Sequence, residues 1–341
     1  MPLKIVRHDI TRMNVDAIVT SGNTSLRPGS GVCGTIFRAA GIERLQKECQ
    51  AIGGCSVGHA VVTKGYDLPA KYIVHTVGPT WQGGHAHEAE LLADCYTHSL
   101  TLAMKSACTS IAFPLISSGI FGYPKEEALE VAIAAIGRFL REFDMTVYLV
   151  VYDRESYVLS KKLHVDIQSY IDDHYIEDHP ARISDIHTEV KAPVSQEIYY
   201  DRDISDEEAF DELLYKKKIG DLQSIIDQAS ETFSERVVRL MQEKRMQRTD
   251  VYRSANIDRR LFSKIYSRRD YTPGRQTALA LAIGLELTLE ETNDLLLRAG
   301  YALSCSSRSD LIVKYFIENR RYDIFELNSV LYGYDLPTLN D

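Results

Sequence analysis

The sequence has no uninterrupted apolar run of about 18 residues, which is the length that a membrane-spanning helix requires. Its first residues are basic but lack the apolar core and small-residue cleavage site of a secretory signal. The six cysteines are scattered, with no C-x-x-C pair and no Cys/His grouping at zinc-ligand spacing. We therefore expect a cytoplasmic protein with free thiols, no metal, no cofactor and no membrane partner.

The chain has 341 residues, of which 45% are hydrophobic and 26% charged, as in ordinary globular proteins. A chain of this length usually forms more than one hydrophobic core, so two or more domains are expected. The net charge of −9 argues against uniform nucleic-acid binding, but the charge is uneven. Residues 172–208 hold twelve Asp/Glu against three Lys/Arg, whereas residues 233–275 hold twelve Lys/Arg against five Asp/Glu. The first stretch predicts a solvated acidic linker, with an acidic arm that competes for a basic surface as the alternative.

Residue patterns divide the chain into an α/β part, a linker and a helical part. From Lys4 to about Leu163, short β-rich runs alternate with helical stretches, which is typical of a layered α/β domain. From Asp206 onward the pattern is helical to the end, so an all-α domain is expected. The predicted boundaries are residues 1–168, an acidic linker at 169–207 and a helical domain at 208–341. Predicted strands are Lys4 to Val6, Ala17 to Thr20, Ala60 to Thr63, Tyr72 to Thr76, Ser110 to Pro114 and Thr146 to Val151; predicted helices are Gly34 to Ala40, Glu88 to Ser106 and Lys125 to Phe143.

Two glycine-rich segments, residues 23–41 and 113–124, each follow a predicted strand and lead into a helix. Glycine lets the backbone approach a ligand closely, and unpaired amides at a helix start attract anions. One such segment alone can simply form a tight turn. Two of them beyond the ends of strands in one sheet could hold a diphosphate from both sides.

Several motifs that carry these features occur in a fixed order over residues 3–165. Together they resemble a macrodomain of the O-acetyl-ADP-ribose deacetylase type, which implies a three-layer α/β fold with a mixed central sheet and ADP-ribose or an ADP-ribosylated substrate as ligand. The motifs are His8-Asp-Ile-Thr11, Val15-Asp-Ala-Ile-Val19, Gly31-Val-Cys-Gly34, Arg38-Ala-Ala-Gly41, Lys71-Tyr-Ile-Val-His-Thr-Val-Gly-Pro79, Ser117-Ser-Gly-Ile-Phe-Gly-Tyr-Pro124 and Val150-Val-Tyr-Asp153.

The resemblance implies a role for individual residues. Asp9 would accept a hydrogen bond from the adenine amino group, Tyr152 would offer the base an aromatic face, and Asn23 would reach the distal ribose. The alternatives are that Asp9 caps a turn and that Tyr152 packs in the core. His75 is expected to be a core histidine. The complete predicted ligand-binding set is Asp9, Ile10, Thr20, Asn23, Gly31, Val32, Cys33, Ser117, Ser118, Gly119, Ile120, Phe121, Gly122 and Tyr152.

Three departures from the family pattern leave catalysis open. The family's Asn-Ala-Ala-Asn is Thr20-Ser-Gly-Asn23 here, its aspartate after Gly-Val is Cys33, and its histidine four residues later is Phe37. A thiol or phenyl ring cannot replace a carboxylate near the anomeric carbon. Hydrolysis would need Asn23 and a substrate phosphate to position water, or Cys33 as a nucleophile. The alternative is a reader of ADP-ribosylation that does not cleave its ligand.

In the basic stretch, Arg248–Ser267 predicts a helix, a tight turn at Asn256-Ile257 and a second helix starting near Asp258. Over residues 233–300 this arrangement resembles a helix-turn-helix of the Cro/repressor type. The resemblance implies DNA as a partner; a protein-contact module or a solvated basic face is the alternative reading. Ligand sensing coupled to such a domain is our hypothesis. The candidate DNA-contacting residues are Arg259, Arg260, Lys264, Arg268 and Arg269.

Overall fold

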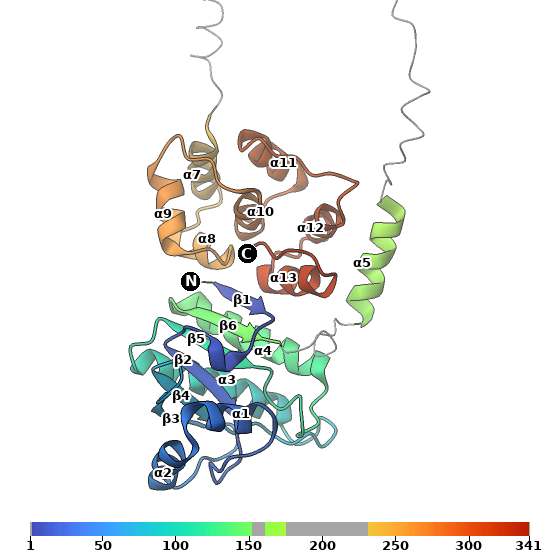
Figure 1. The fold of residues 1–341 in the computed structure, drawn as a ribbon. Helices are drawn as coiled ribbons and strands as arrows, with labels where there is room; N and C mark the ends of the chain where they lie inside the picture. Colours follow the sequence, from blue (N-terminus) through green and yellow to red (C-terminus); the bar gives the residue numbers. More distant parts are fainter. Residues whose placement is uncertain (1, 152–160, 175–230, 341) are drawn as a thin grey trace, which may run out of the picture. The chain divides into compact units, whose positions relative to one another are not determined.

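Six short runs of branched and aromatic residues form one sheet in the computed structural model, which describes residues 2–151, 161–174 and 231–340 (Figure 1). The strand order is β1-β6-β5-β2-β4-β3, and every neighbouring pair is parallel except β3 and β4. The predicted α/β fold with a mixed central sheet is therefore confirmed. The strands are β1 (Leu3–Val6), β2 (Ala17–Ser21), β3 (Ala60–Lys64), β4 (Tyr72–Thr76), β5 (Ser110–Pro114) and β6 (Thr146–Val150).

Alternate residues of the central strands enter two different apolar clusters, one on each face of the sheet. In β2, Ala17 and Val19 belong to the cluster that includes residues of α3 and α4, whereas Ile18 belongs to the cluster that includes residues of α1 and α2. This period of two is what burial on both faces requires. The result is a three-layer domain. Its helices are α1 (Gly31–Ala40), α2 (Ile42–Ile52), α3 (Glu88–Lys105) and α4 (Lys125–Glu142), with a short 3₁₀ turn at Ile10–Arg12.

Helix α2 was not predicted from the sequence. It buries only Leu45 and Cys49, which lie one turn apart, while most of its other side chains are charged or polar. Such a narrow apolar stripe gives a weak periodic signal. The helix ends at Gly53, whose φ of 90° places it in the left-handed conformation typical of a helix end.

Within residues 231–340, every regular element is a helix, as predicted. Asn256 has a φ of 51° in the turn between α8 and α9, and Asp258 caps α9 by accepting from the N–H of Arg260 at 2.7 Å. Gly284 packs against Ala255 so closely that a Cβ there would lie 2.6 Å from the alanine Cβ. These helices are α7 (Phe233–Glu243), α8 (Arg248–Ser254), α9 (Arg259–Ser267), α10 (Arg275–Gly284), α11 (Leu289–Arg298), α12 (Arg308–Glu318) and α13 (Ile324–Gly333).

The described residues before 175 and from 233 onward form one compact unit. In it, the carboxamide of Asn256 pairs with the backbone of Leu3 in β1: Oδ1 accepts from the leucine N–H at 2.8 Å, and Nδ2 donates to the leucine carbonyl at 3.0 Å. Arg253 donates to the carbonyl of Arg141 at the end of α4, at 2.8 Å. The outer strand of the sheet is thus hydrogen-bonded to the turn between α8 and α9.

Helix α5 (Lys161–His174) is described, but residues 175–230 are outside the described residues. These include most of the predicted acidic linker and the expected start of the helical domain at Asp206, so the predicted boundaries stay predictions. Among the described residues, no helix combines the length and apolar character needed to cross a membrane. In the same part of the chain, no three His, Cys, Asp or Glu side chains lie together as a metal site.

Candidate functional site

A cavity of about 260 Å³ lies where three neighbouring parallel strands end. Ser21 ends β2, Pro114 ends β5 and Val150 ends β6, and all three residues line it. The carboxyl ends of parallel strands are where open α/β sheets commonly bind ligands. The described lining consists of Ser21, Ser30, Gly31, Val32, Cys33, Pro114, Leu115, Ser117, Ser118, Gly119, Ile120, Phe121, Val150 and Val151.

One wall of the cavity is the amino end of α1. Ser30 precedes the helix but forms no side-chain cap, so the first amides of the helix, at Gly31, Val32 and Cys33, have no partner among the described residues. Gly34 allows this wall to form, because a Cβ there would lie 2.1 Å from the carbonyl oxygen of Gly29. Unpaired N–H groups and the positive end of the helix dipole make this wall suitable for an anion.

A second wall is formed by residues 117–121, which belong to the segment 117–122 that we call the ligand loop. Ser117 has a φ of 63°, unusual for a residue with a side chain. Inside the loop, the N–H of Gly122 donates to the carbonyl of Gly119 at 3.0 Å. The N–H groups of Ser118 through Phe121 make no hydrogen bond with any described residue. The two walls therefore bring both sequence-predicted glycine-rich segments to one cavity.

The described lining has no carboxylate, imidazole, amine or guanidinium group. Its side-chain polar groups are four serine hydroxyls and the thiol of Cys33. The Cys33 side chain is buried, and its Sγ lies 4.0 Å from the carbonyl of Arg27. A charged ligand would therefore be stabilised by backbone amides and the helix dipole.

Asp9 and Ile10 do not line this cavity. The Oδ1 atom of Asp9 accepts from the N–H of Thr11 at 3.0 Å and from its hydroxyl at 2.7 Å, so the carboxylate caps the 3₁₀ turn. The hydroxyl hydrogen bond is the main cause that lowers the pKa of Asp9. Oδ2 has only an exposed contact with Arg12 at 3.6 Å. Tyr152, the expected aromatic partner of the base, lies outside the described residues.

Thr20, Asn23 and Gly122 also lie outside the lining. The side chain of Asn23 holds its own loop: Oδ1 accepts from the hydroxyl of Ser25 at 2.9 Å and from the N–H of Arg27 at 3.0 Å, and Nδ2 donates to the carbonyl of Arg27 at 2.9 Å. One N–H of the amide is left for a ligand. The hydroxyl of Thr20 is buried without a partner.

Six lining residues were not predicted from the sequence. Five of them stand at or directly after the last residue of a strand, and the sixth, Ser30, precedes a helix. Predicted strand ends could have identified the former, because parallel strands of one sheet end at a common edge. The missed residues are Ser21, Ser30, Pro114, Leu115, Val150 and Val151.

Phe37 and His75 lie in the core behind α1. Phe37 is 1% exposed and packs edge-on against His75, with ring centroids 5.9 Å apart and an interplanar angle of 68°. The Nε2 atom of His75 is 2.9 Å from the hydroxyl of Thr63. Burial lowers the pKa of His75 to about 4. This histidine is therefore neutral near pH 7.

The five candidate DNA-contacting residues are all exposed on α9 or directly after it. The opposite side of α9 buries Phe262 and Ile265 in the core. One of the five is paired: the Nε atom of Arg269 lies 2.7 Å from Oε1 of Glu235. No ion pair with a described residue is made by the other four, Arg259, Arg260, Lys264 and Arg268.

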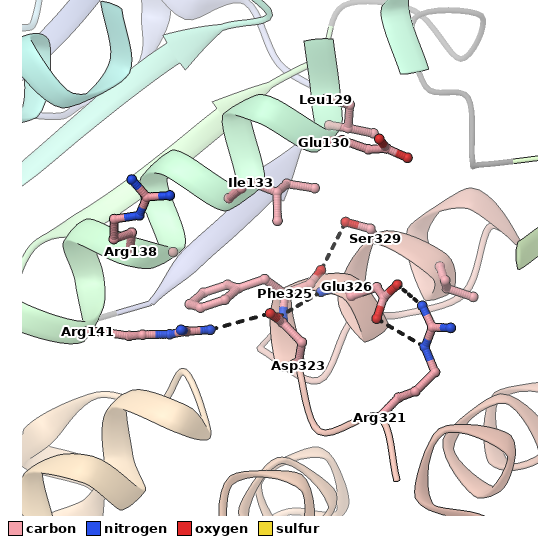
Figure 2. Close-up of a pocket in the computed structure, with 13 residues that line it drawn as sticks. Leu129, Glu130, Ile133, Arg138, Arg141, Arg321, Asp323, Phe325, Glu326 and Ser329 are labelled. Atoms are coloured by element: carbon pink, nitrogen blue, oxygen red, sulfur yellow. Dashed lines mark hydrogen bonds and ion pairs between the residues drawn. The ribbon is translucent and has the colours of Figure 1, made fainter. Parts of the chain in front are cut away.

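A larger cavity, of about 650 Å³, lies between α4 and α13 (Figure 2). Its charged groups are mostly paired: Arg321 binds Glu326, and Arg141 lies 3.5 Å from Asp323. Its floor includes Phe325, which packs on Gly137, where a Cβ would be 3.0 Å from the ring. Because these arginines and carboxylates already stabilise one another, we assign no ligand to this cavity.

Comparison with known proteins identifies the class of this chain. The Macro domain family matches residues 19–132. A macro domain-containing protein of Mesorhizobium japonicum is 50% identical over 156 residues, which are 45% of this chain and 88% of that protein. The O-acetyl-ADP-ribose deacetylase of Escherichia coli K12 is 45% identical over 166 residues, covering 47% of this chain and 94% of the enzyme. The structure of the Oceanobacillus iheyensis macrodomain with ADP is 38% identical, with a TM-score of 0.45, over 49% of this chain and 92% of that one.

The chain therefore belongs to the macrodomain family through its N-terminal half.

Proposed function

We propose that the cavity at the carboxyl ends of β2, β5 and β6 binds ADP-ribose or an ADP-ribosyl group. The observation that carries the proposal is the pair of amide walls: unpaired N–H groups of α1 and of the ligand loop line the same cavity. Such an arrangement suits a diphosphate, whose charge is spread over oxygens on two sides. A relative that is 45% identical is an O-acetyl-ADP-ribose deacetylase, a name that supports the same ligand class.

We assign recognition of the adenine to Asp9. Its Oδ1 is used by Thr11, whereas Oδ2 is left with an exposed contact at 3.6 Å to Arg12. That oxygen can accept a hydrogen bond from an exocyclic amino group. Replacing Asp9 by Asn should weaken the binding of ADP-ribose several-fold, and calorimetry on the full chain would measure it. An unchanged affinity would remove Asp9 from the site.

The amide walls can be tested with an added charge. A Cβ at Gly119 would meet nothing within 4 Å, so Gly119→Asp fits sterically but places a carboxylate on the ligand loop. We expect it to weaken binding at least tenfold, which is about 1.4 kcal/mol. Gly274→Asp is the matched control, because its Cβ is equally unobstructed and the residue is not part of the cavity lining. A wild-type protein that gives no heat with ADP-ribose or its O-acetylated form would refute the proposal.

Binding without hydrolysis is the function that the cavity supports best. The described lining residues include no carboxylate or imidazole that could act as a general base, and Cys33 stands where the resemblance to the family implies an aspartate. The protein is then a reader or sensor of ADP-ribosylation. The deacetylase relative supports the second candidate, hydrolysis, in which the free N–H of Asn23 helps to position water.

Turnover assays distinguish these two functions. O-acetyl-ADP-ribose and substrates ADP-ribosylated on Asp/Glu, Ser and Arg should all stay intact with the wild-type protein if it is a reader. Turnover that is lost in Asn23→Ala while ADP-ribose still binds would establish the hydrolase instead. Turnover lost in Cys33→Ser would point to the thiol.

For the helical half, the unpaired basic face of α9 favours a nucleic-acid duplex as partner, with protein contact as the alternative. Electrophoretic shift of random duplex DNA at low salt should be weakened by the double change Arg260→Glu and Lys264→Glu. The control is Arg320→Glu, an exposed arginine after α12. Absence of any shift with wild-type protein would favour protein contact. If the halves are coupled, saturating ADP-ribose should change the affinity for duplex.

A further inference from the structure

The ligand loop is held in place by a segment that does not line the cavity, residues 78–88, which we call the buttress loop. Gly78 packs against Ser117 so closely that a Cβ would lie 2.1 Å from the serine Oγ. The N–H of Trp81 donates to the carbonyl of Phe121 at 2.8 Å. The Trp81 ring also lies against Tyr123, with centroids 4.6 Å apart. The buttress loop thus contacts Ser117 and Phe121 of the ligand loop, and Tyr123 directly after it.

A single carboxylate organises the buttress loop itself. Glu88 is 2% exposed at the start of α3. Its Oε1 accepts from the N–H groups of Gln82 at 3.0 Å and Gly84 at 3.1 Å, and its Oε2 accepts from that of Ala86 at 2.5 Å. Gly84 lies on the Trp81 ring, since a Cβ there would be 3.2 Å from the indole. Three charge-assisted hydrogen bonds therefore fix the turn that places Trp81.

The ligand loop depends on contacts with the buttress loop because few hydrogen bonds within the loop fix its conformation. Its internal hydrogen bond runs from the N–H of Gly122 to the carbonyl of Gly119. Two more join it to adjacent residues: the N–H of Tyr123 donates to the carbonyl of Ser117, and the Ser118 hydroxyl donates to the carbonyl of Leu115. Ser117 is also held in a left-handed conformation, which costs energy for a residue with a side chain. The directions of the free N–H groups must therefore be set by what packs behind them.

We propose that the buttress loop is the positioning element of the ligand loop, and that Gly78, Trp81 and Glu88 set the affinity for ADP-ribose without touching it. This inference rests on the proposed function. Backbone donors stabilise an anion only when they are already aimed at it, because reorienting them on binding would cost part of the binding free energy. Loosening the buttress loop should therefore weaken binding while the sheet and its core stay intact.

The chain contains one tryptophan, Trp81, which provides a direct readout. Trp81 is half-buried: its backbone N–H binds Phe121 of the ligand loop, and its ring lies against Tyr123, the residue that follows the loop. Adding ADP-ribose to the full-length protein should change tryptophan emission, and the dissociation constant from this titration should equal the calorimetric one.

Two variants test the positioning role. Glu88→Gln keeps the shape of the side chain but removes the charge and one acceptor, so we expect at least fivefold weaker binding and a shifted Trp81 emission before ligand is added. Asp94→Asn is the matched control on the same helix, since that carboxylate is exposed and makes no hydrogen bond or ion pair with a described residue of the buttress loop. It should bind as the wild type does. Circular dichroism should be the same for all three proteins.

The second variant, Gly78→Ala, forces Ser117 to move, and we expect about tenfold weaker binding. In the double variant Gly78→Ala/Ser117→Gly the nearer of the two side chains that meet the new methyl group is gone, while Ile116 Cγ2 stays 2.7 Å from it. Glycine at position 117 also adopts the left-handed conformation freely. Affinity should therefore recover in part. Urea denaturation separates this effect from general destabilisation, because Gly78→Ala should weaken binding at urea concentrations where it is still fully folded.

The results of these experiments distinguish the positioning role of the buttress loop from the proposed binding of ADP-ribose. Wild-type binding of ADP-ribose that neither Glu88→Gln nor Gly78→Ala weakens would overturn this inference and leave the proposed function standing. Weakened binding without any recovery in the double variant would also overturn it. A wild-type protein that does not bind ADP-ribose would refute the proposed function and this inference with it.

Discussion

His75 predicts that the fold loses stability in mild acid. The imidazole is 1% exposed, and its contacts are the ring of Phe37, the hydroxyl of Thr63 at 2.9 Å and the thiol of Cys49 at 4.0 Å. None of these groups carries a negative charge that would offset the burial of a charged imidazole. Burial therefore lowers the pKa from 6.5 to about 4, and the folded protein keeps this histidine neutral at pH values where an unfolded chain would protonate it.

The sign and size of this change in unfolding free energy follow from the number of protons bound by each state. Between pH 6.5 and pH 4 the unfolded state binds a proton that the folded state excludes, so each fall in pH favours unfolding. One pKa unit corresponds to about 1.4 kcal/mol. From pH 8 to pH 5, His75 should therefore remove about 2 kcal/mol of stability, and the loss should level off near 3 kcal/mol below pH 4.

Urea denaturation at pH 8 and pH 5 measures this loss. His75→Gln keeps a hydrogen-bonding group for the hydroxyl of Thr63 but does not titrate, so the difference in unfolding free energy between the two pH values should shrink by about 2 kcal/mol. Carboxylates that titrate in the same range contribute to both proteins and cancel in the comparison. The same change at the exposed His85 should leave the difference as it is in the wild type. If His75→Gln retains the full wild-type difference, the reasoning is wrong.

Other changes give equally direct outcomes. Gly34→Ala should destabilise the fold by about 1–3 kcal/mol in urea denaturation and weaken ADP-ribose binding, because its Cβ would lie 2.1 Å from the carbonyl of Gly29. Asn256→Ala should cost about 2–4 kcal/mol in the same assay, since it leaves both backbone groups of Leu3 without partners; a loss below 1 kcal/mol would contradict this. Native protein should show one fast thiol, Cys305, because the other cysteines are buried, and denaturant should expose all six to a thiol reagent.

The sequence predicted the fold well because the central strands β2, β4 and β5 are buried on both faces. Continuous runs such as Ser110–Pro114 admit few interpretations, and their boundaries agree with the structure to within one residue. Glycine-rich segments predicted both walls of the cavity for a similar reason, since backbone conformation limits which residues can form them.

Polar side chains were harder to place. Asp9 and Asn23 carry groups that can serve a ligand or their own backbone, and both make local hydrogen bonds here. Whether such a group binds a ligand or its own backbone depends on differences in distance of a few tenths of an ångström, and the residue type alone does not determine these distances. Similarly, nothing in Gly78 or Glu88 alone indicates that they contact or fold a loop near residue 120; that relation arises only when β4 and β5 place both loops on one edge of the sheet.

The hydrogen bonds between Asn256 and Leu3 affect how this protein can be divided. They occupy outward-facing backbone groups of a terminal strand, which would otherwise be open to pairing with another molecule. A fragment that ends before residue 175 would lose this protection, and we expect it to self-associate in light scattering at concentrations where the whole chain stays dispersed. The C-terminal helices would then protect the edge of the sheet from intermolecular pairing. Separating the two halves of the chain would therefore make the N-terminal half prone to self-association.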